Sequence, residues 1–151
     1  MCCSIPVRAA VLHLDVQIND LVIHMSDPST SGTALSINHE DLSEELRRIW
    51  LVGRMDMVGV GAIELPFTAL AASRPISVLV DLTGVTFLAS VGLRCIIQSA
   101  KALDLKGGRM ALLVGDNALV RGTLETVCVP EIIPMFSDEA AALESLSAPA
   151  T

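Results

Sequence analysis

Ser90 and Arg94 are the residues of this chain whose types and spacing best fit regulatory chemistry. An apolar, β-branched run at 76–80 precedes them, and Ser90 stands where a loop gives way to apolar residues at helical spacing. A hydroxyl there favours the helix N-cap, beside unpaired backbone N–H groups whose field suits negative charge. Arg94, four residues later, would pair with a phosphate on Ser90. The pattern predicts either a phosphoserine or a plain helix cap whose arginine pairs with an acid elsewhere.

Catalytic motifs are weak in this sequence. Residues 59–64 begin like a dinucleotide-binding fingerprint, but Glu64 stands where the third glycine should be. The chain contains neither a GxxxxGK[ST] phosphate loop nor a GxSxG elbow. The histidines all lie in the least regular part of the chain: His13, His24 and His39. We therefore expect no enzyme activity, no catalytic residues and no cofactor.

The cysteines form no CxxC pair; they are Cys2, Cys3, Cys95 and Cys128. The spacing between the two N-terminal cysteines and the histidines fits no recurring zinc module, so we expect no metal site. Cys95 and Cys128 lie in apolar stretches, where a free thiol behaves as a small hydrophobic residue.

Composition narrows the class of protein. The 151 residues suit one domain, and hydrophobic residues make up 52% of them while aromatic residues make up only 3%, as in aliphatic cores around buried parallel strands. A net charge of −7 and only two lysines, Lys101 and Lys106, argue against binding nucleic acid. No apolar run approaches the ~18 residues of a membrane span, and no basic region of a secretion signal precedes the first apolar patch. We expect a cytoplasmic protein without direct membrane insertion.

Strands and helices are expected to alternate from residue 34 onward. The predicted strands are 34–39, 46–54, 77–82, 110–114 and 132–136. The predicted helices are 59–73, 91–106, 118–127 and 138–146, with Gly107 ending the second and Ser137 capping the last. Asp81 is expected at the end of its strand, near a turn at Thr83-Gly84. The order β-β-α-β-α-β-α-β-α predicts an α/β fold with a mostly parallel sheet.

The N-terminal residues, 1–33, are predicted to be an extension outside the domain of residues 34–148. Residues 11–23 alternate loosely and could form a strand at the sheet edge, whereas 26–33 have the composition of a linker. Met25 is an alternative translation start, which would make residues 1–24 an artefact.

The central stretch, residues 81–94, reads Asp-Leu-Thr-Gly-Val-Thr-Phe-Leu-Ala-Ser-Val-Gly-Leu-Arg. Between a strand and an amphipathic helix, this pattern resembles the signature of STAS domains, and best that of bacterial anti-sigma factor antagonists. Similar steps at 53–56, 107–110 and 124–136 follow in the family's order. Within the last of these, Cys128 stands where the family usually has glycine.

The resemblance implies a STAS-like fold, with helices packed mainly on one side of the sheet. In the family, a partner kinase phosphorylates the serine that Ser90 matches, and Gly92 matches the family's glycine. Ala89 stands in place of an aspartate, and Val91 in place of a small, usually hydroxylated residue. The implied partner-binding residues are Asp56, Phe87, Leu88, Ala89, Ser90, Val91, Gly92 and Arg94; for Asp56 a capping or loop role is the alternative.

Two functions are compatible with this resemblance. One is a regulatory module that binds an anti-sigma factor, a histidine-kinase-like serine kinase, and is switched by phosphorylation at Ser90. The other is an unphosphorylated STAS scaffold subunit of a transport or signalling assembly, which Ala89 and Val91 favour. A homodimer is left open.

Overall fold

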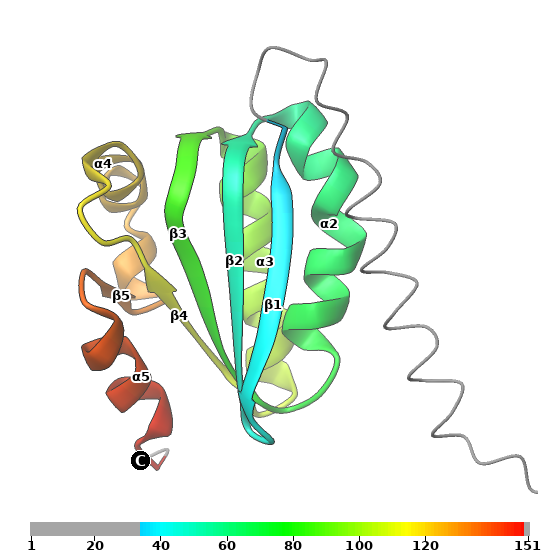
Figure 1. The fold of residues 1–151 in the computed structure, drawn as a ribbon, viewed down its shortest axis with the longest axis vertical. Helices are drawn as coiled ribbons and strands as arrows, with labels where there is room; N and C mark the ends of the chain where they lie inside the picture. Colours follow the sequence, from blue (N-terminus) through cyan, green and yellow to red (C-terminus); the bar gives the residue numbers. More distant parts are fainter. Residues whose placement is uncertain (1–33, 150–151) are drawn as a thin grey trace, which may run out of the picture.

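The computed structural model of the protein describes residues 34–149 and shows a five-stranded sheet with helices on both faces (Figure 1). The strands lie side by side in chain order, β1-β2-β3-β4-β5. The first two are antiparallel, and all later pairs are parallel. The elements are β1 (Ser36–Ser43), β2 (Leu46–Met55), α2 (Met57–Ala72), β3 (Ser77–Leu88), α3 (Ser90–Leu105), β4 (Arg109–Leu113), α4 (Ala118–Thr126), the 3₁₀ turn η1 (Val129–Glu131), β5 (Met135–Phe136) and α5 (Glu139–Ser147).

Two hydrophobic clusters hold the layers together. The larger cluster lies between the sheet and α2, α3 and α4; Val80 enters it from β3, while Phe67 and Ile96 enter it from the helices. Side chains alternate between the faces of a strand, so Leu79 points the other way and packs in the smaller cluster with Leu146 of α5. The prediction of an α/β fold with helices mainly on one side is confirmed, with α5 as the element on the other face. Between residues 34 and 149, no helix is both long and apolar enough to cross a membrane.

The predicted order of elements is confirmed, but the central strand is longer than predicted. β3 continues to Leu88 instead of ending at Leu82, because β2 accompanies it with register shifts that absorb the irregular region. Gly84 therefore lies inside the strand rather than in a turn. A Cβ at Gly84 would approach Val52 Cγ2 to 2.9 Å, which explains a glycine where two backbones pass closely.

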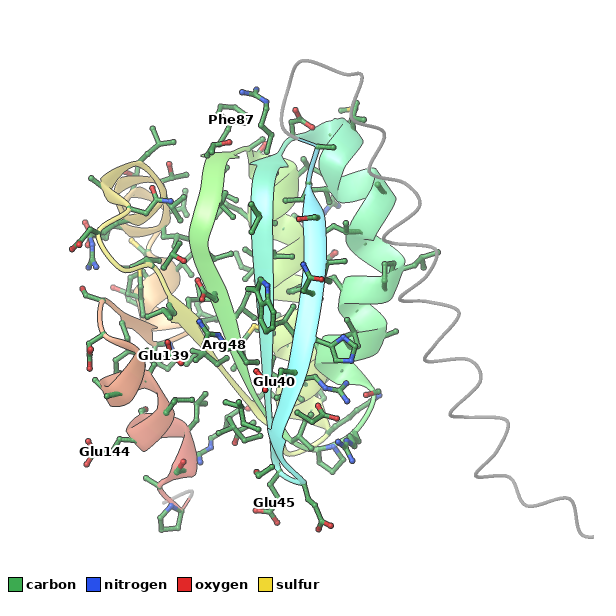
Figure 2. The ribbon with its side chains drawn as sticks, viewed as in Figure 1. Glu40, Glu45, Arg48, Phe87, Glu139 and Glu144 are labelled. Atoms are coloured by element: carbon green, nitrogen blue, oxygen red, sulfur yellow. The ribbon has the colours of Figure 1, made fainter. Side chains whose placement is uncertain are left out.

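Asp81 is a buried residue inside β3 rather than at its end, because the strand continues beyond its predicted limit. Its carboxylate accepts a hydrogen bond from Arg48 Nη2 at 2.6 Å and one from Thr83 Oγ1 at 2.6 Å. Arg48 also donates to Glu139 Oε1 of α5 at 2.7 Å, so one guanidinium joins β2, β3 and α5 (Figure 2). Burial alone would raise the pKa of Asp81, but the hydrogen bonds from Thr83 and Arg48 outweigh it and lower that pKa.

The last third of the chain departs from the predicted boundaries. Residues 129–131 form a 3₁₀ turn, and β5 is only Met135–Phe136, because a proline at 134 offers no N–H to a ladder. Asp138, rather than Ser137, caps α5, since its carboxylate accepts from Ala141 N at 3.0 Å. Gly107 has a φ of +87°, as expected for a residue that ends a helix.

The cysteines at 95 and 128 differ in environment. Cys95 is buried, as predicted, and burial raises the pKa of its thiol to about 11. The apolar environment predicted for Cys128 is wrong: its side chain is exposed, and its φ of 57° places the backbone in the left-handed region. That conformation favours glycine, which the family usually has there. Trp50 is half-buried beside Arg48 and belongs to neither hydrophobic cluster.

Candidate functional site

The predicted partner-binding residues come together because β2 and β3 are neighbours and parallel. Their carboxyl ends therefore reach the same edge of the sheet, where loops of α/β folds commonly carry function. Arg54 pairs with Phe87 and Met55 with Leu88 in the ladder. The pairing continues one step into the loop, where Ala89 N donates to Met55 O at 3.0 Å. The start of α2 and the start of α3 are thus fixed against each other.

Ser90 is the first residue of α3 rather than its N-cap, so the predicted capping role is wrong. Ala89 is the N-cap, with φ −86° and ψ 166°, and it provides no side-chain acceptor. The N–H groups of Gly92 and Leu93 donate to Ala89 O at 3.0 and 3.2 Å. By position, the N–H groups of Ser90 and Val91 have no acceptor within α3. The exposed Ser90 hydroxyl therefore stands at the positive end of a 16-residue helix.

Gly92 lets this first turn pack against β2. A Cβ at this position would lie 2.9 Å from Leu88 Cδ1 and 3.0 Å from Met55 Cβ. Gly92 and Leu88 are both buried, so these two predicted residues support the loop from inside. Val91 is half-buried and packs against the larger hydrophobic cluster.

Arg54 links the two halves of the site. Its Nε donates to Asp56 Oδ2 at 3.2 Å, and its guanidinium carbon lies 4.6 Å from the centre of the Phe87 ring. Phe87, at the end of β3, is 38% exposed (Figure 2). Arg54 is exposed as well, so the pair presents an aromatic ring and a charge at the surface. The contact with Phe87 does not follow from sequence spacing, because Arg54 and Phe87 meet only through the β2–β3 register. In the sequence, only the family-like motif at residues 53–56 drew attention to Arg54.

Asp56 serves as the N-cap of α2, the alternative that the sequence left open. Its carboxylate accepts from Gly59 N at 2.9 Å, and this bond, together with that from Arg54, lowers the pKa of Asp56. Gly59 has a steric reason to be glycine, since a Cβ would approach Arg54 O to 2.2 Å. The cap leaves part of the carboxylate accessible, so capping and partner contact are compatible.

The loop surface is defined here as the accessible side chains around this edge: Arg54, Asp56, Met57, Val58, Phe87, Ser90 and Arg94. Sequence reasoning missed Arg54, Met57 and Val58. The last two are 79% and 83% exposed, which is unusual for apolar residues beside a charged loop. Within residues 34–149, Arg94 is exposed and makes no ion pair, so the predicted alternative of a bridge to another acid has no support there.

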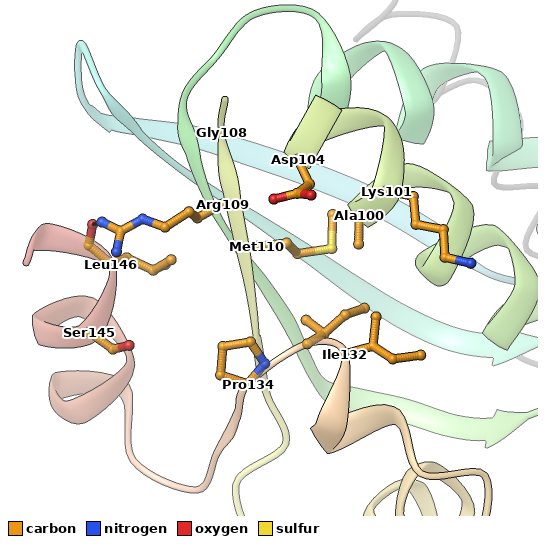
Figure 3. Close-up of a pocket in the computed structure, with 11 residues that line it drawn as sticks. Ala100, Lys101, Asp104, Gly108, Arg109, Met110, Ile132, Pro134, Ser145 and Leu146 are labelled. Carbon is orange, nitrogen blue, oxygen red and sulfur yellow. Dashed lines mark hydrogen bonds between the residues drawn. The ribbon is translucent and has the colours of Figure 1, made fainter. Parts of the chain in front are cut away.

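A hollow of about 260 Å³ lies elsewhere, between the C-terminal part of α3, β4 and the end of α5 (Figure 3). Arg109 reaches from β4 to α5, where its Nη2 donates to Leu146 O at 2.7 Å and also to Ala148 O. The Arg109 guanidinium thus donates to carbonyl groups at the C-terminal end of α5, where a positive charge is favourable. No residue of the loop surface lines this hollow. In the described part of the chain, no group of three or more acidic, histidine or cysteine residues could hold a metal ion.

Comparison with solved structures shows which proteins have a similar fold. It is similar to an anti-sigma factor antagonist from Mycobacterium paratuberculosis, with 22% sequence identity, a TM-score of 0.68, and coverage of 82% of this chain and 100% of that one. The unphosphorylated anti-sigma factor antagonist SpoIIAA gives 17% identity, a TM-score of 0.62, and coverage of 77% and 100%. The phosphorylated form of SpoIIAA, a Bacillus cell fate determinant, gives 17% identity, a TM-score of 0.56, and coverage of 73% of this chain and 98% of that one. At these identities the similarity shows a shared fold.

Sequence-level comparison gives the family. No curated protein matches the chain. A family model described as the STAS domain matches residues 12–142, which is most of the chain. The match begins within residues 1–33, outside the described residues, so the predicted domain boundary at residue 34 stays a prediction. The matched range contains all of the loop surface, and the chain belongs to the STAS domain family.

Proposed function

We propose that this chain is a cytoplasmic regulatory module that binds an anti-sigma factor of the histidine-kinase-like serine kinase type. In this proposal the loop surface is the partner contact, and phosphorylation of Ser90 controls it. The observation that carries the proposal is the placement of Ser90: an exposed hydroxyl at the first position of α3, beside the cluster of Arg54, Asp56 and Phe87. Family membership and the fold shared with anti-sigma factor antagonists support it.

The electrostatics of the α3 N-terminus suit a phosphorylated serine. The first-turn N–H groups and the helix dipole stabilise negative charge. Arg94, one turn later, makes no ion pair within residues 34–149 and would complete the counter-charge. A phosphate would therefore be tolerated by the fold itself, and its main effect would be on what docks against the loop.

The loop surface has the mixture of groups found at protein interfaces. Met57, Val58 and Phe87 offer exposed apolar area, and Asp56 and Arg54 add fixed charges next to it. Energetically important contacts gather at the centre of an interface, where water is excluded. A phosphate on Ser90 would bring about −1.5 to −2 charges into that centre, so phosphorylation should release the partner.

The test is a binding measurement with the serine kinase recovered when the full chain is purified from its native cells. Ser90→Asp should weaken binding at least about tenfold, roughly 1.4 kcal/mol, in titration calorimetry. Ala141→Asp is the matched control: it adds the same charge to the exposed first turn of α5, on the other face of the sheet, and should leave affinity unchanged. Phosphopeptide mapping of the native protein should find phosphate on Ser90.

The second candidate function is the unphosphorylated scaffold subunit. The observation that favours it is Ala89, which leaves the N-cap of α3 without the acceptor that an aspartate would provide. Equal affinity of Ser90→Asp and wild type would exclude the switch. Recovery of a transport assembly instead of a kinase would favour the scaffold.

A further inference from the structure

The outward face of α2 is apolar although no described element covers it. α2 forms one margin of the described molecule (Figure 1). Its inner face, with Ile63 and Phe67, is buried in the larger hydrophobic cluster. On the outer side Val58 and Leu65 are each 83% exposed. A helix that is apolar on all sides is normally covered on all sides.

The exposed apolar residues follow the spacing of a helix-pairing seam. Residues 58, 62, 65 and 69 are separated by four, three and four positions, which places them along one stripe. This stripe, the α2 seam, consists of Val58, Ala62, Leu65 and Ala69, all exposed. Glu64 is the only charged residue of α2, and it lies toward α3, where it adds to the raised pKa of Cys95. The seam itself is uncharged.

We infer that the α2 seam pairs with the same seam of a second copy of this chain, with the two helices antiparallel. In that arrangement Val58 faces Ala69 of the other copy, and Ala62 faces Leu65. Each large side chain then meets a small one, and a two-fold axis satisfies all four contacts at once. A parallel pair would instead place leucine on leucine and leave gaps between the alanines.

The net charge of the chain and the area that the α2 seam can bury both bear on whether a second copy is the partner. Each copy carries a net charge of −7, so association requires a face without carboxylates, and the seam is such a face. A 16-residue helix is about 24 Å long, and one helix-to-helix contact covers less than the ~800 Å² per partner of a standard stable interface. The expected dimer is therefore weak, with a dissociation constant in the range of about 10 to 100 µM.

Analytical ultracentrifugation of the full chain from about 5 to about 500 µM tests the inference. The average mass of wild type should rise from the 15.9 kDa of one chain toward twice that value. Leu65→Glu should weaken association at least about tenfold without lowering the melting temperature. Adding Ala62→Lys to Leu65→Glu should restore association, because lysine and glutamate face each other only in the antiparallel pair. Leu105→Glu, at an 88% exposed site on α3, is the matched control and should associate like wild type.

Several results would overturn the inference. The inference is wrong if wild type stays monomeric at the highest concentration. In that case, a lower melting temperature of Leu65→Glu would show that another part of the same chain covers the seam. Loss of association in Leu105→Glu would show unspecific adhesion. A double variant that remains monomeric would contradict the antiparallel arrangement. Val58 belongs to both the α2 seam and the loop surface, but none of these variants alters a residue of the loop surface, so failure of the seam and failure of the proposed partner site remain distinguishable.

Discussion

Ala89 occupies the N-cap position of α3, where a side-chain acceptor would normally satisfy a first-turn N–H group. Asp56, Asn117 and Asp138 supply such acceptors for the other helices, each to the N–H group three residues later. Among the α-helices of residues 34–149, the helix that carries the proposed switch is therefore the one without a side-chain cap. A phosphate on Ser90 would place oxygens beside these N–H groups.

Ala89→Asp should raise the free energy of unfolding by about 1 kcal/mol, because the new carboxylate would accept from the first turn and complement the helix dipole. Urea denaturation measures this difference. Ala89→Asn separates the two effects, since it keeps the acceptor and removes the charge. Ser90→Ala should change stability by less than about 0.5 kcal/mol, because Ser90 is exposed and is not the cap. A loss as large as 1 kcal/mol in Ser90→Ala would contradict this assignment.

Cys128 is the only non-glycine residue with positive φ in the described part of the chain. The left-handed conformation costs a residue with a Cβ about 1–2 kcal/mol, and glycine avoids that cost while losing more backbone entropy. Cys128→Gly should therefore stabilise the protein by roughly 0.5–1 kcal/mol in urea denaturation. Cys128→Ala, which removes the thiol and retains the Cβ, should bring no such gain. Equal stability of the two variants would show that the backbone is not strained there.

These residue-level features differ in how far the sequence predicts them. The glycine-like position of Cys128 was visible because the family usually has glycine there. The predicted N-cap of α3 was wrong by one residue. Ser90 and Ala89 are both possible N-cap positions in the sequence, and only the backbone angles show that Ala89 is the cap. The contact of Arg54 with Phe87 was invisible, because it depends on a β2–β3 register with two irregularities.

At the scale of elements, Arg48 ties the α5 layer to the sheet. Its side chain leaves β2, crosses to Asp81 of β3 and reaches Glu139 of α5. The two acids differ in burial: the side chain of Asp81 is 8% exposed and that of Glu139 is 44% exposed. Exposed ion pairs contribute little to stability, whereas breaking a buried pair leaves an uncompensated charge. The Asp81 contact should therefore dominate the energy of this network.

Asp81→Asn should lower the free energy of unfolding by about 2 kcal/mol at neutral pH, whereas Glu139→Gln should cost less than about 1 kcal/mol. The folded-state pKa of Asp81 is lowered, so its contribution is fully present above the unfolded value of about 3.9 and is lost as pH falls through the folded value. The difference between wild type and Asp81→Asn should accordingly shrink on acidification. Urea denaturation at a series of acidic pH values measures it. A difference that stays constant with pH would show that Asp81 does not act through its charge.

At the scale of the molecule, the alternation of strands and helices was predictable because apolar periodicity changes along the chain. The order of the elements, the parallel sheet and the helix-covered face all follow from that pattern and from the family resemblance. The uncharged outer face of α2 could not be recognised in advance. The same residues would suit a buried helix, and only the positions of the neighbouring elements between residues 34 and 149 show which side those elements leave uncovered.

Residues 1–24 should be dispensable for the stability of the domain. Residues 34–149 form a five-stranded sheet with two hydrophobic clusters of their own. A chain starting at Met25 should therefore keep its melting temperature within about 3 °C of the full chain, since loss of ~1 kcal/mol shifts a domain of this size by only a few degrees. Differential scanning calorimetry of both proteins measures this. The STAS family model matches the chain from residue 12 onward, so the opposite outcome would also be informative. A large drop, or insoluble protein, would show that the segment from residue 12 is an integral part of the domain.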